Sequence, residues 1–211
     1  MKKLIILTLA VLLAIPSTAQ IYKRYEPSRY HREGSEHYFG LRLGLNLSSI
    51  SSENVDIDAD YLAGLYLGGV YGIQLAYRAP VWLELGLGYS EKGGIARPEG
   101  YKMKYRLSYL EAPITVKYSF DVSDFRIQPF LGGYLAVGIM GKIKDYRQHD
   151  ASKSTFDSFR RFDGGLRLGC GAEYRMLYLE VGFDFGLANI SKDDFDTARN
   201  RCFFFNAGVN F

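Results

Sequence analysis

Large apolar residues alternate with small or polar residues along much of this chain. Residues 39–47, which read FGLRLGLNL, have a large apolar side chain at every odd position and glycine, a charged or a polar residue at every even position. Successive side chains of a β-strand point to opposite faces, so this spacing predicts a strand with one apolar and one polar face. A helix would mix the two sets of residues.

The same spacing recurs in seven further segments, at 61–77, 81–89, 110–118, 127–139, 162–174, 177–187 and 203–211. A tilted strand needs about 9 to 11 residues to cross a bilayer, and these segments have about that length. We therefore expect an all-β fold, an eight-stranded antiparallel up-and-down transmembrane β-barrel with a filled polar interior. The alternation slips at Ser108 and Tyr109, where we expect a bulge, and Pro113 indicates a local irregularity rather than a broken strand.

The connections between these segments alternate in length. Those at 49–60, 90–103, 141–161 and 190–201 are long and polar, and those at 78–80, 120–125 and 175–176 are short. Outer-membrane barrels have long outer loops and short periplasmic turns. With an even number of strands, both termini are expected in the periplasm. A soluble β-sandwich has no reason to sort its loops in this way.

Aromatic residues end the apolar faces of the predicted strands at both surfaces of the expected membrane. On the side of the short turns these are Phe39, Tyr77, Tyr118, Tyr174 and Phe211, and on the other side Tyr61, Tyr89, Phe162 and Phe203. Two such belts around an aliphatic band are typical of membrane barrels. A soluble barrel with buried aromatic residues would explain the aromatic content but not its sorting by depth.

The N-terminus carries an export signal. Lys2 and Lys3 precede an apolar run over 4–15, and small residues at 17–19 offer a cleavage site. The run is shorter than the roughly 20 residues of a spanning helix, which argues against an uncleaved anchor. We expect a signal peptide over 1–19, a periplasmic tail over 20–37 and the barrel over 38–211. The localisation would be the outer membrane.

Composition adds little to this interpretation. The 23 Gly, 17 Tyr and 14 Phe of the 211 residues suit many closely packed strands. The net charge of +3 is small, and no basic run is interleaved with stacking aromatic residues, so we expect no nucleic-acid partner.

The inward positions of the predicted strands carry nearly balanced charges. The cations are Arg42, Arg78, Lys117 and Arg167, and the anions are Glu84, Glu111, Glu173, Glu180 and Asp184. Charges removed from water need paired, hydrogen-bonded partners, and an eight-stranded barrel has just enough room for side chains. We expect a structural ion-pair network, with Tyr66, Trp82, Phe130 and Tyr134 filling the space. A path for protons or ions is the alternative, although conducting pores usually carry one excess sign.

No residue pattern indicates catalysis, a metal or another cofactor. His31 and His37 lie in the predicted tail and His149 in an outer loop, so none is held beside a nucleophile. The carboxylates of Asp56, Asp58 and Asp60 resemble the start of a calcium loop, but the glycine and the bidentate glutamate of that motif are missing. An acidic solvated loop is the better interpretation.

Three further features are the basic outer loop, the two cysteines and the N-terminal tail. The outer loop over 142–161 is basic and could contact lipopolysaccharide, although a solvated loop is the simpler interpretation. Cys170 is expected to face lipid and Cys202 the interior, so we expect both thiols to be free. The basic and tyrosine-rich tail is expected to be a mobile periplasmic leader, and it is also the best candidate for docking a periplasmic protein.

The chain resembles the PorT-like outer-membrane β-barrel proteins of Bacteroidetes. The likeness lies in the segments GLRLGLN at 40–46, LGYSEKGG at 87–94, YLEAPI at 109–114 and GLANI at 186–190. It implies an eight-stranded barrel that is inserted by the barrel-assembly machinery, with the terminal aromatic Phe211 as the assembly signal. It also implies a link to type IX protein secretion, although many relatives share only the barrel.

We therefore expect a non-enzymatic outer-membrane barrel with a role in the envelope or in binding a partner. The first alternative is an accessory component of the type IX secretion system. The second is a narrow channel or a lipid-modifying enzyme. The fold alone does not choose between these functions.

Overall fold

The computed structural model describes residues 37–52, 60–76, 79–96, 103–145, 160–191 and 197–211. The predicted signal peptide and nearly all of the predicted tail therefore lie outside the described residues. The same is true of Arg78, Tyr77, Asp56, Asp58 and the middle of the basic loop. Among the described residues, no helix is long and apolar enough to span a membrane.

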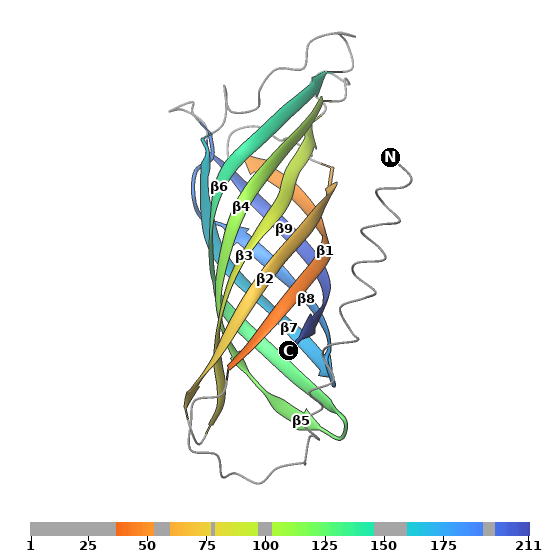
Figure 1. Ribbon diagram of the computed structural model, residues 1–211. Coiled ribbons are helices and arrows are strands. Elements are labelled where there is room, and N and C mark those ends of the chain that lie inside the picture. The colour runs from red at the N-terminus through yellow and green to blue at the C-terminus, as the bar shows by residue number, and fades with distance from the viewer. Residues whose placement is uncertain (1–36, 53–59, 77–78, 97–102, 146–159, 192–196) are drawn as a thin grey trace, which may run out of the picture. The chain divides into compact units, whose positions relative to one another are not determined.

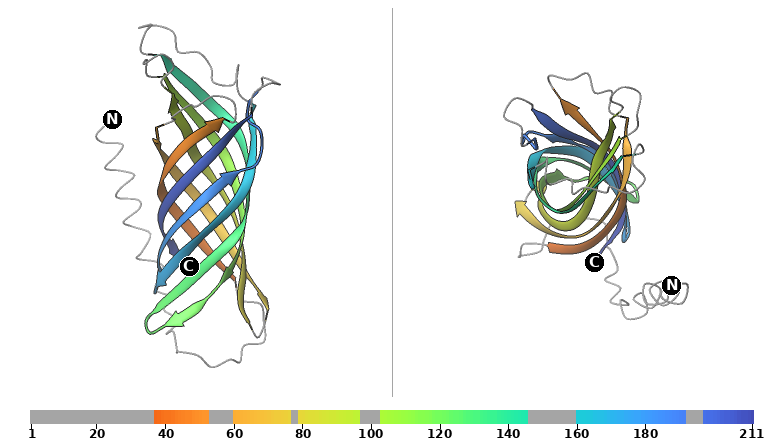
Figure 2. Two further views of the ribbon diagram at one scale, coloured as in Figure 1. Left: turned by 180° about the vertical axis from the view of Figure 1, so that it is seen from behind. Right: turned by 90° about the horizontal axis from the view of Figure 1, so that it is seen from above.

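The described chain forms a closed antiparallel barrel whose strands are tilted relative to its axis (Figures 1 and 2). Its strands are β1 (His37–Ser52), β2 (Leu62–Ala76), β3 (Ala79–Ala96), β4 (Met103–Tyr118), β5 (Phe120–Val122), β6 (Phe125–Asp145), β7 (Phe162–Tyr174), β8 (Leu177–Gly186) and β9 (Ala198–Asn210). Each strand of the wall pairs with its two neighbours; β1 pairs with β9, and β4 pairs with β6. The predicted eight-stranded barrel is confirmed, because the three-residue β5 pairs only with β6 and adds a hairpin to one turn.

The two faces of the wall are sorted as the alternation predicts. Leu43 and Leu67 lie opposite each other in the β1–β2 register and are 61% and 59% exposed. Arg42, the neighbour of Leu43, is 1% exposed, and Glu84 and Glu180 are 7% and 8% exposed. Ionic side chains thus fill the interior and leucines cover the outside, which is the reverse of a soluble barrel.

Tight turns join the strands at one end of the barrel, which we call the turn end. Arg175, between β7 and β8, has a φ of 57°, and Ser123, between β5 and β6, has a φ of 56°. The opposite end carries the longer connections, and we call it the loop end. The strands continue there into segments that were predicted to be loops, since β1 reaches residue 52, β3 reaches 96 and β6 reaches 145.

These predicted loop boundaries were wrong for a physical reason. The apolar alternation stops where the contact with lipid would stop, but the backbone hydrogen bonds do not depend on lipid. The β3–β4 register, for example, continues without a break from Gly88–Glu111 to Ala96–Met103. Residues 90–96 therefore belong to the wall of the barrel.

The bulge predicted at Ser108 and Tyr109 and the irregularity predicted at Pro113 both occur, but neither has the expected form. The register between β4 and β6 shifts between Ser108 and Tyr109, but the additional residue is Ile139 of β6. The alternation of β4 itself is kept, because Leu107, Tyr109 and Glu111, each two positions apart, are all fully buried in the interior. At Pro113 the pairing with β3 stops after Leu85–Ile114 and resumes at Gly88–Glu111 without a change of register.

Candidate functional site in the barrel interior

A cluster of two cations and two carboxylates fills the barrel toward the loop end. The Lys92 Nζ lies 2.7 Å from Glu111 Oε2 and 3.0 Å from Asp184 Oδ2. Arg167 lies on the other side of both carboxylates. Its Nη2 donates to Glu111 Oε1 at 2.6 Å, and its Nε and Nη2 donate to the two oxygens of Asp184 at 2.7 and 2.8 Å. Each charge in this loop-end cluster therefore has two partners of opposite sign.

A second cluster lies toward the turn end. Glu84 accepts from Lys117 Nζ at 2.8 Å and from Arg42 Nη2 at 3.3 Å. Tyr38 donates to Glu84 Oε2 at 2.5 Å. Glu180 lies 3.8 Å from Lys117 Nζ and accepts from Asn206 Nδ2 at 2.7 Å. The two clusters together hold four cations and four carboxylates, so their formal charge is zero.

Aromatic rings pack against the same cations. Lys92 Nζ lies 3.9 Å from the ring centre of Tyr134, and the Arg167 guanidinium lies 4.5 Å from that of Phe204. The Arg42 guanidinium lies 4.0 Å from the ring centre of Tyr178, whose hydroxyl accepts from Lys117 Nζ at 2.7 Å. Cation–π contacts of this kind are strongest when water is excluded. Rings thus occupy the space that water would fill in a pore.

A small cavity remains between the two clusters. It is lined by Arg42, Tyr66, Glu84, Phe130 and Arg167, among others, and has a volume of about 10 Å³. A space of that size holds about one water molecule. The space left between the side chains at this level is therefore about that of a single water molecule.

An apolar layer covers the loop-end cluster. Ile190 and Leu107 are fully buried, and the layer is completed by Ile50, Tyr109, Tyr134, Ala136 and Ala198. The backbone of Ile190 is fixed by two hydrogen bonds, from its N–H to the Ala198 carbonyl at 2.9 Å and from the Arg160 N–H to its carbonyl at 2.7 Å. The chain after β8 thus folds inward and shields the ions from the loop end.

Nine charged residues were predicted for the ion-pair network. Arg78 lies outside the described residues, and the other eight project into the interior without forming a single group. Seven of them belong to the two clusters: Arg42, Glu84, Glu111, Lys117, Arg167, Glu180 and Asp184. The eighth, Glu173, lies at the turn end, where it accepts from Arg126 Nη1 at 3.1 Å and from Asn210 Nδ2 at 2.6 Å. Of the predicted filling rings, Tyr66, Phe130 and Tyr134 are buried and Trp82 is half-buried.

Lys92 joins Glu111 to Asp184 and is fully buried, but it was not among the residues predicted for the network. It was assigned to a loop because the apolar half of the alternation ends at Tyr89. The inward half continues, since Gly88, Ser90 and Lys92 all point to the interior. This continued alternation of inward positions is the sequence signal that could have placed Lys92 in the interior.

The remaining candidate residues lie away from the interior. Phe211 is exposed beside the end of β9, and its N–H donates to the Phe39 carbonyl at 2.7 Å. His37 begins β1 and packs near the ring of Tyr71, whereas His31 and His149 lie outside the described residues. Cys170 is exposed and Cys202 is buried, and both thiols are free. Within the described residues, no group of three or more His, Cys, Asp or Glu side chains could hold a metal ion.

A family profile agrees with this architecture. The profile described as an outer membrane protein beta-barrel domain matches residues 19–192. The chain belongs to this outer-membrane β-barrel family. This membership supports a location in the outer membrane, with the leucine-covered wall of the barrel in contact with lipid. A comparison with curated proteins gave no match.

Solved structures of outer-membrane proteins share the fold. A major outer membrane protein of Thermus thermophilus is 14% identical, with a TM-score of 0.53, over 83% of this chain and 100% of that one. OprG of Pseudomonas aeruginosa is 13% identical, with a TM-score of 0.50, over 86% of this chain and 97% of that one. Ail of Yersinia pestis is 15% identical, with a TM-score of 0.44, over 83% and 99%. At these identities the likeness concerns the fold alone.

Proposed function

We propose that this protein is a non-conducting, non-enzymatic component of the outer membrane that acts through its exterior and its two ends. The observation that supports the proposal is the balance of charge in the two interior clusters. Four buried cations pair with four buried carboxylates, and rings fill the space between them. Asp163, a further buried carboxylate, accepts a hydrogen bond from Asn200 Nδ2 at 2.8 Å. A conducting pore would need a continuous water path and usually an excess of one sign of charge.

Conductance measurements test this proposal. The purified protein, reconstituted in planar bilayers, is expected to show no stepwise current above that of the protein-free bilayer. A variant with Tyr66→Ala and Phe130→Ala removes two rings beside the central cavity but leaves every ion pair in place. We expect this variant to leak, because the loss of both rings enlarges the cavity between the two clusters. Discrete channels from the unaltered protein would contradict the proposal.

The second candidate function is an accessory role in type IX secretion, which the PorT-like segments imply. Three of these segments supply Arg42, Lys92 and Glu111 to the buried clusters. The likeness in these segments therefore concerns residues that fill the barrel interior rather than a surface that could bind a partner. Deletion of the gene tests the role: a secretion accessory would leave exported cargo in the periplasm, and normal secretion would reject this function.

A further inference from the structure

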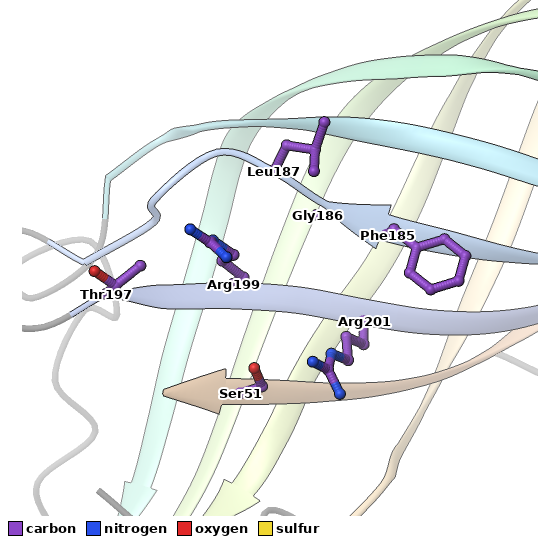
Figure 3. Close-up of a pocket in the computed structure, with 7 residues that line it drawn as sticks. All are labelled: Ser51, Phe185, Gly186, Leu187, Thr197, Arg199 and Arg201. Carbon is purple, nitrogen blue, oxygen red and sulfur yellow. The ribbon is translucent and has the colours of Figure 1, made fainter. Parts of the chain in front are cut away.

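The outside of the barrel carries a pocket at the loop end, where the ends of β8, β9 and β1 come together (Figure 3). Its volume is about 230 Å³. The lining combines two guanidinium groups, from Arg199 and Arg201, with the Ser51 hydroxyl and with apolar side chains of Phe185 and Leu187. This pocket is separate from the barrel interior.

The alternation of β9 explains why both arginines face outward. Asn200 and Cys202 are each 1% exposed in the interior, so Arg199 and Arg201 project from the outer face, where both are exposed. The register places Ser51 of β1 opposite Arg199, and Phe185 of β8 opposite Arg201. Three strands thus bring a hydroxyl, two guanidinium groups and a phenyl ring to one patch.

The patch lies where the apolar face of the wall ends. The next two outward positions, toward the middle of β9, are Phe203 and Phe205, which are 42% and 43% exposed. Phe185 is 42% exposed and Leu187 is 60% exposed. Aromatic residues mark the level at which hydrocarbon gives way to headgroups. The two arginines therefore lie at headgroup depth, directly beyond a row of lipid-facing phenyl rings.

Two cations at this spacing favour an anionic ligand. Side chains two positions apart on a strand share a face, and their Cα atoms are about 7 Å apart. A phosphate can accept from both guanidinium groups, since the planar donor fork of arginine matches its oxygens. Basic pockets at the membrane surface bind phosphorylated lipid headgroups for the same reason.

We propose that this pocket binds a phosphate of an anionic glycolipid in the outer leaflet. Arg199 and Arg201 would hold the phosphate, with Ser51 as an additional donor, while Phe185 and Leu187 would contact the apolar part of the lipid. The site goes beyond the proposed function, because it does not depend on whether the interior conducts. It rests on the predicted orientation, in which the loop end lies at the cell surface.

Native mass spectrometry of the full protein in neutral dodecyl maltoside micelles tests the site. The probes are bisphosphorylated lipid A, the same lipid after removal of its phosphates, and inorganic phosphate. We expect one lipid A molecule to bind, the dephosphorylated lipid to bind at least tenfold more weakly, and equimolar inorganic phosphate not to displace lipid A. The double variant R199Q/R201Q should bind lipid A at least tenfold more weakly than the unaltered protein.

The matched control is R106Q/K142Q. It removes the same charge from the outward face at the loop end, on β4 and β6, whose side chains lie opposite each other in the register. Equal losses in both double variants would mean general attraction to the rim and would overturn the site. Displacement by inorganic phosphate would overturn the assignment to a lipid.

A third result would also overturn the proposal. Asp193, Asp194 and Asp196 precede β9 in the sequence, outside the described residues. If R199Q/R201Q kept full lipid binding and only lowered the unfolding temperature, the arginines would serve as partners of other residues of the chain. Circular dichroism of each variant would confirm that the barrel is folded before lipid binding is compared.

Discussion

Lys92 holds one side of the loop-end cluster, opposite Arg167. Its ammonium group touches Glu111 and Asp184 and packs on the ring of Tyr134, with no exposed side-chain surface. A buried ion pair adds little net stability compared with apolar residues of the same volume, but the removal of one partner leaves a buried charge without compensation. The cost of losing Lys92 should therefore be large.

The substitution Lys92→Met tests this dependence. It keeps most of the side-chain volume and removes the charge, and we expect the free energy of unfolding to fall by about 3–5 kcal/mol. The measurement is urea unfolding of the refolded protein in lipid vesicles. As a control, Arg106→Gln removes an exposed cation 3.7 Å from Glu91, and about 0–1 kcal/mol is expected. Equal effects of the two substitutions would contradict the buried role of Lys92.

Glycines on the inward face let neighbouring backbones and large side chains share the narrow interior. A methyl group on the inward-facing Gly165 would meet the Phe185 carbonyl of the adjacent strand. Gly69 instead faces outward, and the nearest atom to a methyl group there is the Gly40 carbonyl oxygen at 3.8 Å. The two glycines are therefore not equivalent, although both lie in strands.

We expect Gly165→Ala to destabilise the barrel by about 1–3 kcal/mol, because backbone must move to admit the methyl group. Gly69→Ala should be neutral or stabilising by up to about 1 kcal/mol, since alanine loses less backbone entropy in a strand. Thermal unfolding followed by circular dichroism compares the two variants. A larger loss at Gly69 would show that the strand register differs from the one described.

At the scale of the strand, one face of β1 is built for hydrocarbon. Leu41, Leu43 and Leu45 are 49%, 61% and 55% exposed, and the neighbouring even positions are buried. Such exposure in water would make the surface prone to aggregation, and a lipid environment removes that difficulty. The pattern of β1 therefore indicates a lipid environment as well as a β-strand.

The loss of stability caused by a single arginine on the outer face depends on how deep in the membrane that position lies. At the middle of the apolar band, Leu43→Arg should reduce the stability in lipid vesicles by about 2–4 kcal/mol. The same change at Leu187, at the loop end, should cost about 0–1 kcal/mol. Reversible folding into vesicles would give both values. A similar small cost at both positions would indicate that Leu43 does not face hydrocarbon.

At the scale of the whole molecule, the pairing of the first and last strands closes the sheet. The β1–β9 register runs from Gly40–Asn210 to Ser52–Ala198, so no strand edge is left open along that seam. Closure satisfies the backbone hydrogen bonds that lipid cannot satisfy. Both termini of the barrel then lie at the turn end.

The predicted orientation can be tested on intact cells. An epitope inserted beside Ser152, in the connection between β6 and β7, should be labelled by antibody without permeabilisation. The same epitope in the hairpin at residues 120–125 should be labelled only after the outer membrane is opened. The reverse pattern would place the loop end in the periplasm and would remove the basis for a site for outer-leaflet lipid.

Much of the fold could be predicted because the alternation of side chains is a local property. Phe162–Tyr174 was predicted to the residue, and the inward or outward direction of Arg42, Glu84, Cys170 and Val181 followed from counting positions. The loop-end strand extensions were missed, because hydrogen bonding there continues without an apolar face. Lys92 was lost from the predicted network for that reason.

The sequence by itself determined which side chains face lipid and which face the interior, because a period of two needs only neighbouring residues. Only the tertiary structure decided which charges meet. Lys92 and Asp184 are 92 positions apart, and their contact depends on the register of every strand pair between them around the closed wall. The pocket at Arg199 and Arg201 likewise needs β1, the first strand, beside β9, the last.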